Sequence, residues 1–127
     1  MKLLLDTTVL IDVLRNRKGR RELLADLVRA GHSLSTSALN IAEVYGGIRS
    51  GEEGRTEAFL AGLDEFGLEG RVARTAGRLK TTWEKKGRTI ALADAIVAVI
   101  AIEKECALLT DNRKDFPMPE LRLYPLP

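Results

Sequence analysis

The chain has 127 residues, of which 45% are hydrophobic, 30% are charged and 5% are aromatic, as is typical of one soluble globular domain. So few aromatic residues argue against a platform for stacking single-stranded bases, and a formal net charge of +2 is too small to indicate nucleic-acid binding by itself. Cys106 is the only cysteine, which excludes an internal disulfide and a cysteine-based metal site. No apolar run is long enough for a secretory signal or a membrane span, so we expect a cytoplasmic protein without a membrane partner.

Short apolar runs alternate with longer helical patterns along the chain. In chain order, the pattern predicts a strand over 2–6, helices over 7–15 and 19–30, a strand over 33–36, a helix capped by Ser37, a helix from Gly54 to about Glu65, a weak edge strand over 66–69, helices over 71–86 and within 89–105, and strands over 107–110 and 121–124. This alternation predicts an α/β fold with a parallel sheet between helices, in which ligands bind outside the carboxyl ends of the strands.

Asp6 lies at the junction of two apolar elements, between the run Leu3-Leu4-Leu5 and the helical stripe that begins at Val9. Burying a carboxylate is costly unless it is paired, hydrogen-bonded or bound to a metal. Its position at the carboxyl end of the first strand therefore makes Asp6 a candidate functional residue.

Two further acids lie in apolar helical patterns. Glu43 shares a helical face with Leu39 and the glycine pair 46–47, so it either points into a cleft or is a rim residue that pairs with an arginine such as Arg49. Asp94 is the only charged residue in TIALADAIVAVIAI, where it either caps the buried helix or serves as a ligand; the two roles are compatible.

A fourth acidic segment, TDNRKDF at residues 110–116, follows another strand and is either a simple turn or the loop that completes a site. Together these acids occupy segments that converge at one edge of a parallel sheet. Like charges repel, so a cluster without arginine partners is best explained by a bound cation. Oxygen ligands alone favour Mg²⁺ or Mn²⁺ over Zn²⁺.

The segments LLLDTTVLID, NIAEVYGG, LADAIVAVIA and LLTDNRKDF resemble, in this order, the four acidic motifs of PIN-domain ribonucleases, and most of all the small VapC-type toxins of toxin–antitoxin pairs. The resemblance spans Lys2 to Phe116. It implies a single PIN-like nuclease domain over residues 1–127, folded as a three-layer α/β/α sandwich with a short, mostly parallel central sheet.

The resemblance also implies roles for single residues. Asp6 and Asp94 would be the principal ligands of Mg²⁺ or Mn²⁺, and Glu43 would complete the acidic pocket. In the fourth motif the pattern favours Asp115 as the remaining catalytic acid, with Asp111 as the alternative. The polar residues expected to orient ligands, water or RNA phosphate are Thr7 or Thr8, Thr110 and Asn112.

The implied activity is that of a metal-dependent endoribonuclease, the toxin of a type II toxin–antitoxin system, with a homodimeric state and a cognate small antitoxin as partner. Two basic clusters are candidates for binding the RNA backbone, or are simply solvated faces: Arg15, Arg17, Lys18, Arg20 and Arg21 in one, and Lys85, Lys86 and Arg88 in the other. The alternative function is a non-catalytic RNA-binding or regulatory PIN-like domain. The DTT sequence is also similar to the nucleophile motif of haloacid dehalogenase phosphatases, but that motif requires an aspartate where this chain has Thr8.

Overall fold

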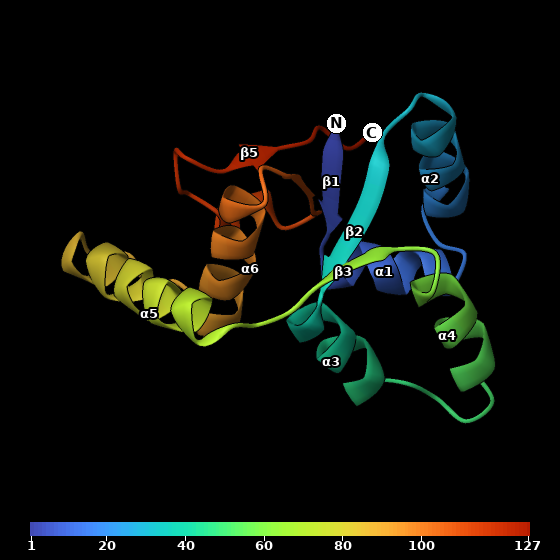
Figure 1. Ribbon diagram of the computed structural model, residues 1–127, viewed down its shortest axis with the longest axis horizontal. Helices are drawn as coiled ribbons and strands as arrows, with labels where there is room; N and C mark the ends of the chain where they lie inside the picture. Colours follow the sequence, from blue (N-terminus) through green and yellow to red (C-terminus); the bar gives the residue numbers. More distant parts are fainter.

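The computed structural model describes residues 1–127 as one sheet between two layers of helices (Figure 1). The five strands pair in the order β3-β2-β1-β4-β5, and all four pairings are parallel. Their bounds are β1 Lys2–Leu5, β2 Ser33–Ser37, β3 Asp64–Phe66, β4 Ala107–Leu109 and β5 Arg122–Leu123. The predicted α/β/α sandwich is therefore confirmed, with a sheet that is entirely parallel.

Six α-helices and one short 3₁₀ turn connect the strands. They are α1 Thr7–Leu14, α2 Arg20–Arg29, α3 Ala38–Gly46, α4 Glu53–Leu60, α5 Gly70–Lys85, α6 Leu92–Glu103 and the 3₁₀ turn Arg113–Asp115. In Figure 1, α5 and α6 lie on one side of the sheet and α1, α2 and α4 on the other. None of these helices combines the length and the apolar character that crossing a membrane requires.

The two central strands are apolar on both faces because helices cover both. Leu4 and Leu108 belong to the core under α5 and α6, whereas Leu3, Leu5 and Leu109 belong to the core under α1 and α2. All five side chains are fully buried. Continuous leucine runs of this kind are typical of parallel strands buried on both sides.

The prediction for the segment after Gly54 was wrong in its boundaries. The helix α4 ends at Leu60 and not near Glu65, and the edge strand occupies Asp64–Phe66 instead of 66–69. A turn at 61–63 ends the helix, and Phe66 then pairs in register with Ser37 of β2 and packs against the core. The short segment is a strand because β2 offers it a free edge, which local sequence does not reveal.

The carboxyl ends of β1, β2 and β4 lie at one edge of the sheet because the strands are parallel. Asp6 follows β1 directly, α3 begins directly after β2, and Thr110 follows β4. α3 contacts α1 on one side of the sheet and α6 on the other. The parallel topology therefore brings Asp6, the helix that carries Glu43 and the segment after β4 to one edge of the sheet.

We expect the substitution Leu108→Ala to lower the free energy of unfolding by about 3 kcal/mol, because it leaves a cavity under α6 in a strand that cannot move. Urea unfolding measures this. Leu68→Ala is the matched control, since Leu68 is 42% exposed and its truncation should cost no more than about 0.5 kcal/mol. Equal losses for the two variants would contradict the assignment of Leu108 to the core.

Candidate active site

Asp6 is a buried carboxylate held by three hydrogen-bond donors. Oδ1 accepts from the backbone N–H of Thr7 at 2.9 Å and from Nδ2 of Asn40 at 3.3 Å, and Oδ2 accepts from Oγ1 of Thr110 at 2.7 Å. Burial raises the pKa of Asp6, and these donors oppose that rise by stabilising the charged form. Because Oδ2 accepts only one of these bonds, it retains a lone pair for a further ligand.

Asn40 is a functional residue that the sequence analysis missed. It is fully buried on α3, where its Nδ2 donates to Asp6 and to Oγ1 of Thr7 at 3.0 Å. Its Oδ1 accepts from Oγ of Ser37 at 2.6 Å, and the same serine oxygen caps the helix, as predicted, by accepting from the Asn40 backbone N–H at 3.2 Å. The sequence feature that could have identified Asn40 as a site residue is its position one helical turn before Glu43.

Glu43 lies at the rim of the site and is exposed to solvent. Its Oε1 accepts a 2.6 Å hydrogen bond from Oγ1 of Thr7. No ion pair joins it to Arg49, so the alternative of a rim pair with that arginine is wrong. The second carboxylate oxygen of Glu43 accepts no hydrogen bond from the protein.

Asp94 does not cap the apolar helix. Ala91 occupies the cap position of α6, and Asp94 lies in the first turn. Burial raises the pKa of Asp94 to about 6, and the negative charges of Asp6, Asp115 and Glu43 add to the rise. Three of the predicted acids therefore act on the carboxyl group of the fourth, although the four come from separate segments of the chain.

The two candidates for the fourth acid have different surroundings. Asp115 ends the 3₁₀ turn and lines a pocket of about 380 Å³ together with Asp94 and Arg88. Asp111 instead accepts a 2.8 Å bond from the guanidinium of Arg20, and Lys18 lies 3.7 Å from its other oxygen. The geometry favours Asp115 as the acid of the site and gives Asp111 a role in holding the loop.

Three polar side chains around the acids differ in what they contact. Thr110 is buried, and its Oγ1 accepts the backbone N–H of Asn112 at 3.0 Å while it donates to Asp6. Asn112 makes this contact through its backbone, and its side chain is on the exposed loop. Of the two threonines after Asp6, Thr7 contacts Glu43, whereas the hydroxyl of Thr8 is buried without a hydrogen-bond partner.

The first basic cluster is mostly engaged within the protein. Arg20 is 4% exposed and pairs with Asp111, so it is unavailable to RNA, and Arg21 donates to two backbone carbonyls of α1. Arg15 contacts Glu52 and lines a separate cavity of about 270 Å³ that none of the four acids lines. Arg17, Lys18 and Arg21 are on exposed positions, and Lys18 lies within ion-pair distance of Asp12 and Asp111.

The second basic cluster lies beside the acids. Arg88 lines the same pocket as Asp94 and Asp115, where it donates to the backbone carbonyl of Lys114. Lys85 and Lys86 are exposed at the end of α5, and Nζ of Lys86 lies 4.8 Å from the ring centre of Trp83.

The donor set of the site fits a hard divalent cation. No Lys or Arg forms an ion pair with Asp6, Glu43, Asp94 or Asp115. No three acidic, histidine or cysteine side chains are arranged to enclose one ion. Mg²⁺ does not need such a cage, because it keeps several waters and binds through one or two carboxylates. Asp6 and Asp94 are the residues that would hold it.

Comparison with known proteins finds similarity over almost the whole chain. Residues 3–118 match the PIN domain family. The chain is 34% identical over 120 residues to Ribonuclease VapC19 of Mycobacterium tuberculosis, covering 94% of this chain and 96% of that protein. It is 30% identical to Ribonuclease VapC10 of the same species, over 91% of this chain and 86% of the relative.

Solved structures share the fold. VapBC2 from Rickettsia felis, bound to a DNA fragment from its promoter, superposes with a TM-score of 0.84 at 24% identity and covers 98% of both chains. A toxin–antitoxin complex from Klebsiella pneumoniae gives a TM-score of 0.77 at 25% identity, with 94% of both chains covered.

We expect Asp111→Asn to lower the free energy of unfolding by about 2 kcal/mol, because it leaves the buried Arg20 guanidinium without its carboxylate. Chemical unfolding at neutral pH measures the loss. The control is Asp26→Asn, which removes an ion pair with Arg29 in which both side chains are more than half exposed, and should cost no more than about 0.5 kcal/mol. A loss no larger than that of the control would refute a structural role for Asp111.

The raised pKa of Asp94 predicts a pH-dependent stability in the absence of divalent cations. Between about pH 4 and pH 6 the folded state binds more protons than the unfolded state, so the free energy of unfolding falls as the pH rises through this window. Asp94→Asn should lessen this fall, of which the raised pKa of Asp6 keeps a part, and stabilise the protein at pH 7 by about 1 kcal/mol, less than the full shift implies because the carboxyl is only partly buried.

The measurement is thermal or urea unfolding in EDTA at pH 4 and pH 7. Asp64→Asn, at an exposed position on the edge strand, is the control and should keep the wild-type pH profile. A profile for Asp94→Asn identical to that of wild type would show that the carboxyl does not carry the repulsion.

Proposed function

This chain belongs to the PIN-domain family, and on that premise we propose that it is a metal-dependent endoribonuclease, the toxin of a type II toxin–antitoxin pair. The observation that carries the proposal is the electrostatic convergence of Asp6, Glu43 and Asp115 on Asp94 without a basic partner. A cluster of this kind is stable at neutral pH when a cation balances it. The ribonuclease names of its relatives supply the substrate class.

The reaction is hydrolysis of an RNA phosphodiester. A new bond forms between a water oxygen and phosphorus, the bond to the leaving oxygen breaks, the water loses a proton and the leaving oxygen gains one. Bound Mg²⁺ or Mn²⁺ would supply Lewis-acid stabilisation of the charge on the phosphate and lower the pKa of a bound water.

The protein residues orient the acids for this reaction. Thr110 and Asn40 donate to the two oxygens of the Asp6 carboxylate and so restrict its orientation. Thr7 donates to Oε1 of Glu43 and leaves Oε2 free to accept the proton from water. Asp94 and Asp115 complete the acidic wall of the pocket that Arg88 shares.

The partners follow from the same family. We propose a small antitoxin as the protein partner, on the basis of structural neighbours described as VapBC or toxin–antitoxin complexes. A homodimer and a cytoplasmic location are part of the same proposal. Light scattering of the purified chain, alone and after co-expression with the product of an adjacent small gene, measures both assemblies.

A non-catalytic RNA-binding or regulatory domain is the second candidate. It is favoured by one observation, the absence of three carboxylates arranged around a single point. The presence of all four acids, with Asp6 held by three donors, favours the enzyme instead. Turnover distinguishes the two candidates, because only the enzyme releases cleaved RNA.

We expect the purified protein, free of antitoxin, to cleave a mixed RNA pool in Mg²⁺ or Mn²⁺ and not in EDTA. Asp94→Asn should reduce the rate at least about 100-fold, because it removes a charged ligand of the metal. Gel electrophoresis of end-labelled RNA measures cleavage, and circular dichroism checks that the variant is folded.

Glu69→Gln is the control for loss of one carboxylate, since Glu69 is exposed outside the site and should retain wild-type cleavage. Asp115→Asn should reduce the rate with little effect on stability. Cleavage by the wild-type protein in EDTA, or undiminished cleavage by folded Asp94→Asn, would refute the metal mechanism. Failure to cleave under any metal would favour the non-catalytic candidate.

A further inference from the structure

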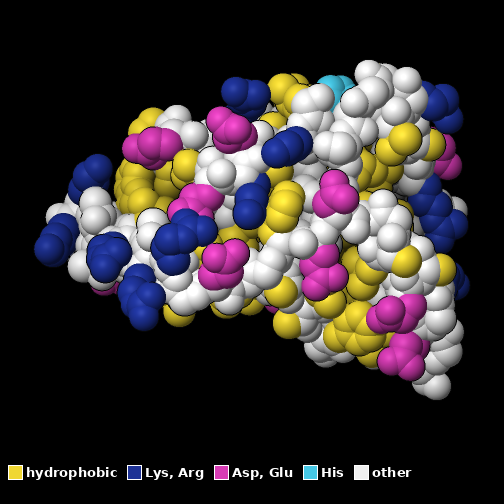
Figure 2. Space-filling model, in the orientation of Figure 1, with side chains coloured by type: hydrophobic (Ala, Val, Ile, Leu, Met, Phe, Trp, Pro, Cys, Tyr) yellow, Lys and Arg dark blue, Asp and Glu magenta, His cyan; other side chains and the backbone are white.

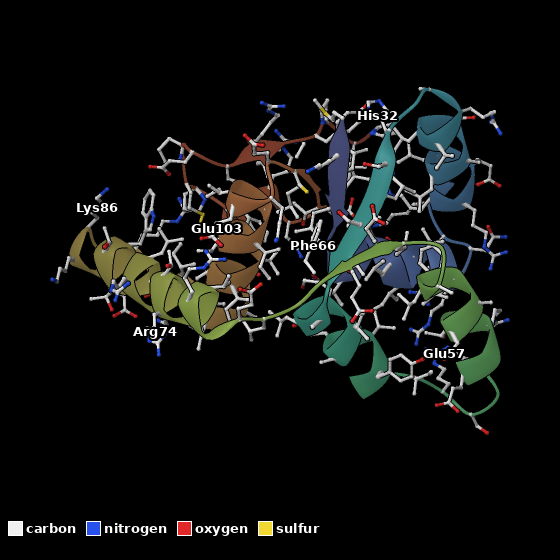
Figure 3. All side chains as sticks on the ribbon, in the orientation of Figure 1. His32, Glu57, Phe66, Arg74, Lys86 and Glu103 are labelled. Atoms are coloured by element: carbon white, nitrogen blue, oxygen red, sulfur yellow. The ribbon has the colours of Figure 1, made fainter.

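One face of α5 is uncovered and carries cations without partners. The opposite face packs Val72 and Ala76 into the core under α6. Figure 3 shows Arg74 pointing away from α6, and Figure 2 shows basic side chains gathered over this end of the molecule. α5 thus projects a surface that the rest of the chain does not use.

The cations on this face form a straight row, which we call the α5 cationic row and define as Arg74, Arg78 and Lys85. With Thr81 they are spaced four, three and four residues apart, which keeps them on one side of the helix over a length of about 16 Å. All three side chains are on exposed positions, and none lies within ion-pair distance of an acid.

The other charges of the helix are paired elsewhere. Arg71 pairs with Glu69 and Glu103, and Lys80 pairs with Glu84, the only acid within α5. The row therefore keeps three uncompensated positive charges, although acids are almost as numerous as bases in the chain as a whole. Oppositely charged side chains three or four residues apart stabilise an exposed helix, and the α5 cationic row contains no such pair.

Small residues line the same face beside the row. Ala73, Gly77 and Thr81 follow one another at four-residue spacing, and the space over Gly77 is open. Together with the row they border a shallow groove of about 570 Å³. A polymeric ligand bound along this groove can approach the helix closely while its negative charges contact the cations.

The groove is continuous in sequence with the acidic pocket. Beyond Lys85 the chain turns at Gly87, where φ is +84°, and Arg88 then lines the pocket with Asp94 and Asp115. Only Lys86 and Gly87 separate Lys85, which lines the groove, from Arg88, which lines the pocket.

We propose that the α5 cationic row binds the phosphate backbone of RNA outside the cleavage pocket, so that the protein favours long RNA over short fragments. This inference rests on the proposed function for the choice of RNA. Charge complementarity selects the occupant: a second copy of the chain packed on the small residues through a twofold axis would bring one cationic row against another. A polyanion removes that repulsion and gains the release of its counterions.

The test compares two variants that each lose three positive charges, both in an Asp94→Asn background that keeps RNA intact. One carries R74Q, R78Q and K85Q, and glutamine preserves helix propensity at these positions. The matched control carries K2Q, R29Q and R122Q, at exposed positions outside α5. The probes are fluorescein-labelled oligouridylates of about 6 and about 30 nucleotides, with binding followed by fluorescence anisotropy across a range of salt concentrations.

We expect the α5 variant to weaken binding of the long probe at least about tenfold and to lower the slope of log affinity against log salt by about 2, as three lost contacts to a single strand require. The preference for the long probe should disappear. The control variant should keep both the preference and most of the slope. Equal losses of affinity in the two variants would refute the proposal that the row binds RNA. They would show an effect of net charge only.

Two further outcomes separate this inference from the proposed function. A wild-type protein that cleaves RNA, with an α5 variant that binds both probes normally, would refute the row alone. If the wild-type protein never cleaves RNA but the α5 variant loses affinity for the long probe, the proposed nuclease activity is refuted. The proposal that the α5 cationic row binds RNA is then supported. Light scattering of the α5 variant completes the test: a changed oligomeric state with an unchanged salt slope would assign the face to a second copy and overturn the proposal.

Discussion

The structure is organised around the negative charge buried at Asp6. A carboxylate in this position is destabilising unless donors replace the water it has lost, and each donor comes from a different part of the chain. The Thr7 backbone supplies one at the start of α1, Asn40 another from α3, and Thr110 the third from the end of β4. The same bonds that make the charge tolerable therefore fix the positions of α1, α3 and β4 relative to one another. The acidic edge of the sheet therefore depends on all three donors.

The sequence was sufficient for the architecture and for the principal acids. Short runs of leucine favour strands covered on both sides, and their alternation with helical patterns predicts a parallel sheet, in which the carboxyl ends of the strands lie at one edge. Asp6 and Asp94 were proposed because a charge in or beside an apolar segment is conspicuous, whereas Asp115 was preferred over Asp111 only through the resemblance to the PIN-domain motifs. Their convergence follows from topology and requires no knowledge of side-chain positions.

What the sequence could not reveal was which polar groups contact one another. Asn40 looks like an ordinary helical residue in the sequence, and only the packing of α3 beside the end of β1 brings its amide to Asp6. Arg20 belongs to a run of basic residues that all read as solvent-exposed, yet it alone is buried, because backbone turns with positive φ at Lys18 and Gly19 place the start of α2 against Asp111. Long-range contacts of this kind depend on packing between elements, and no local pattern encodes them. The role of Asp111 in holding its loop could not be predicted for the same reason, since it depends on the contact with Arg20.

The bond between Thr110 and Asp6 joins residues 104 positions apart, and β4 pairs with β1 across a similar separation. During synthesis the ribosome releases β1, α1 and α3 long before β4, so a partly made chain has the acids Asp6 and Glu43 but lacks the strand beside β1 and the donor to Oδ2. Non-local pairing of this type forms late in folding. The centre is thus assembled only when nearly the whole chain has left the ribosome. A protein that cuts RNA would by this arrangement remain harmless to the message from which it is being translated.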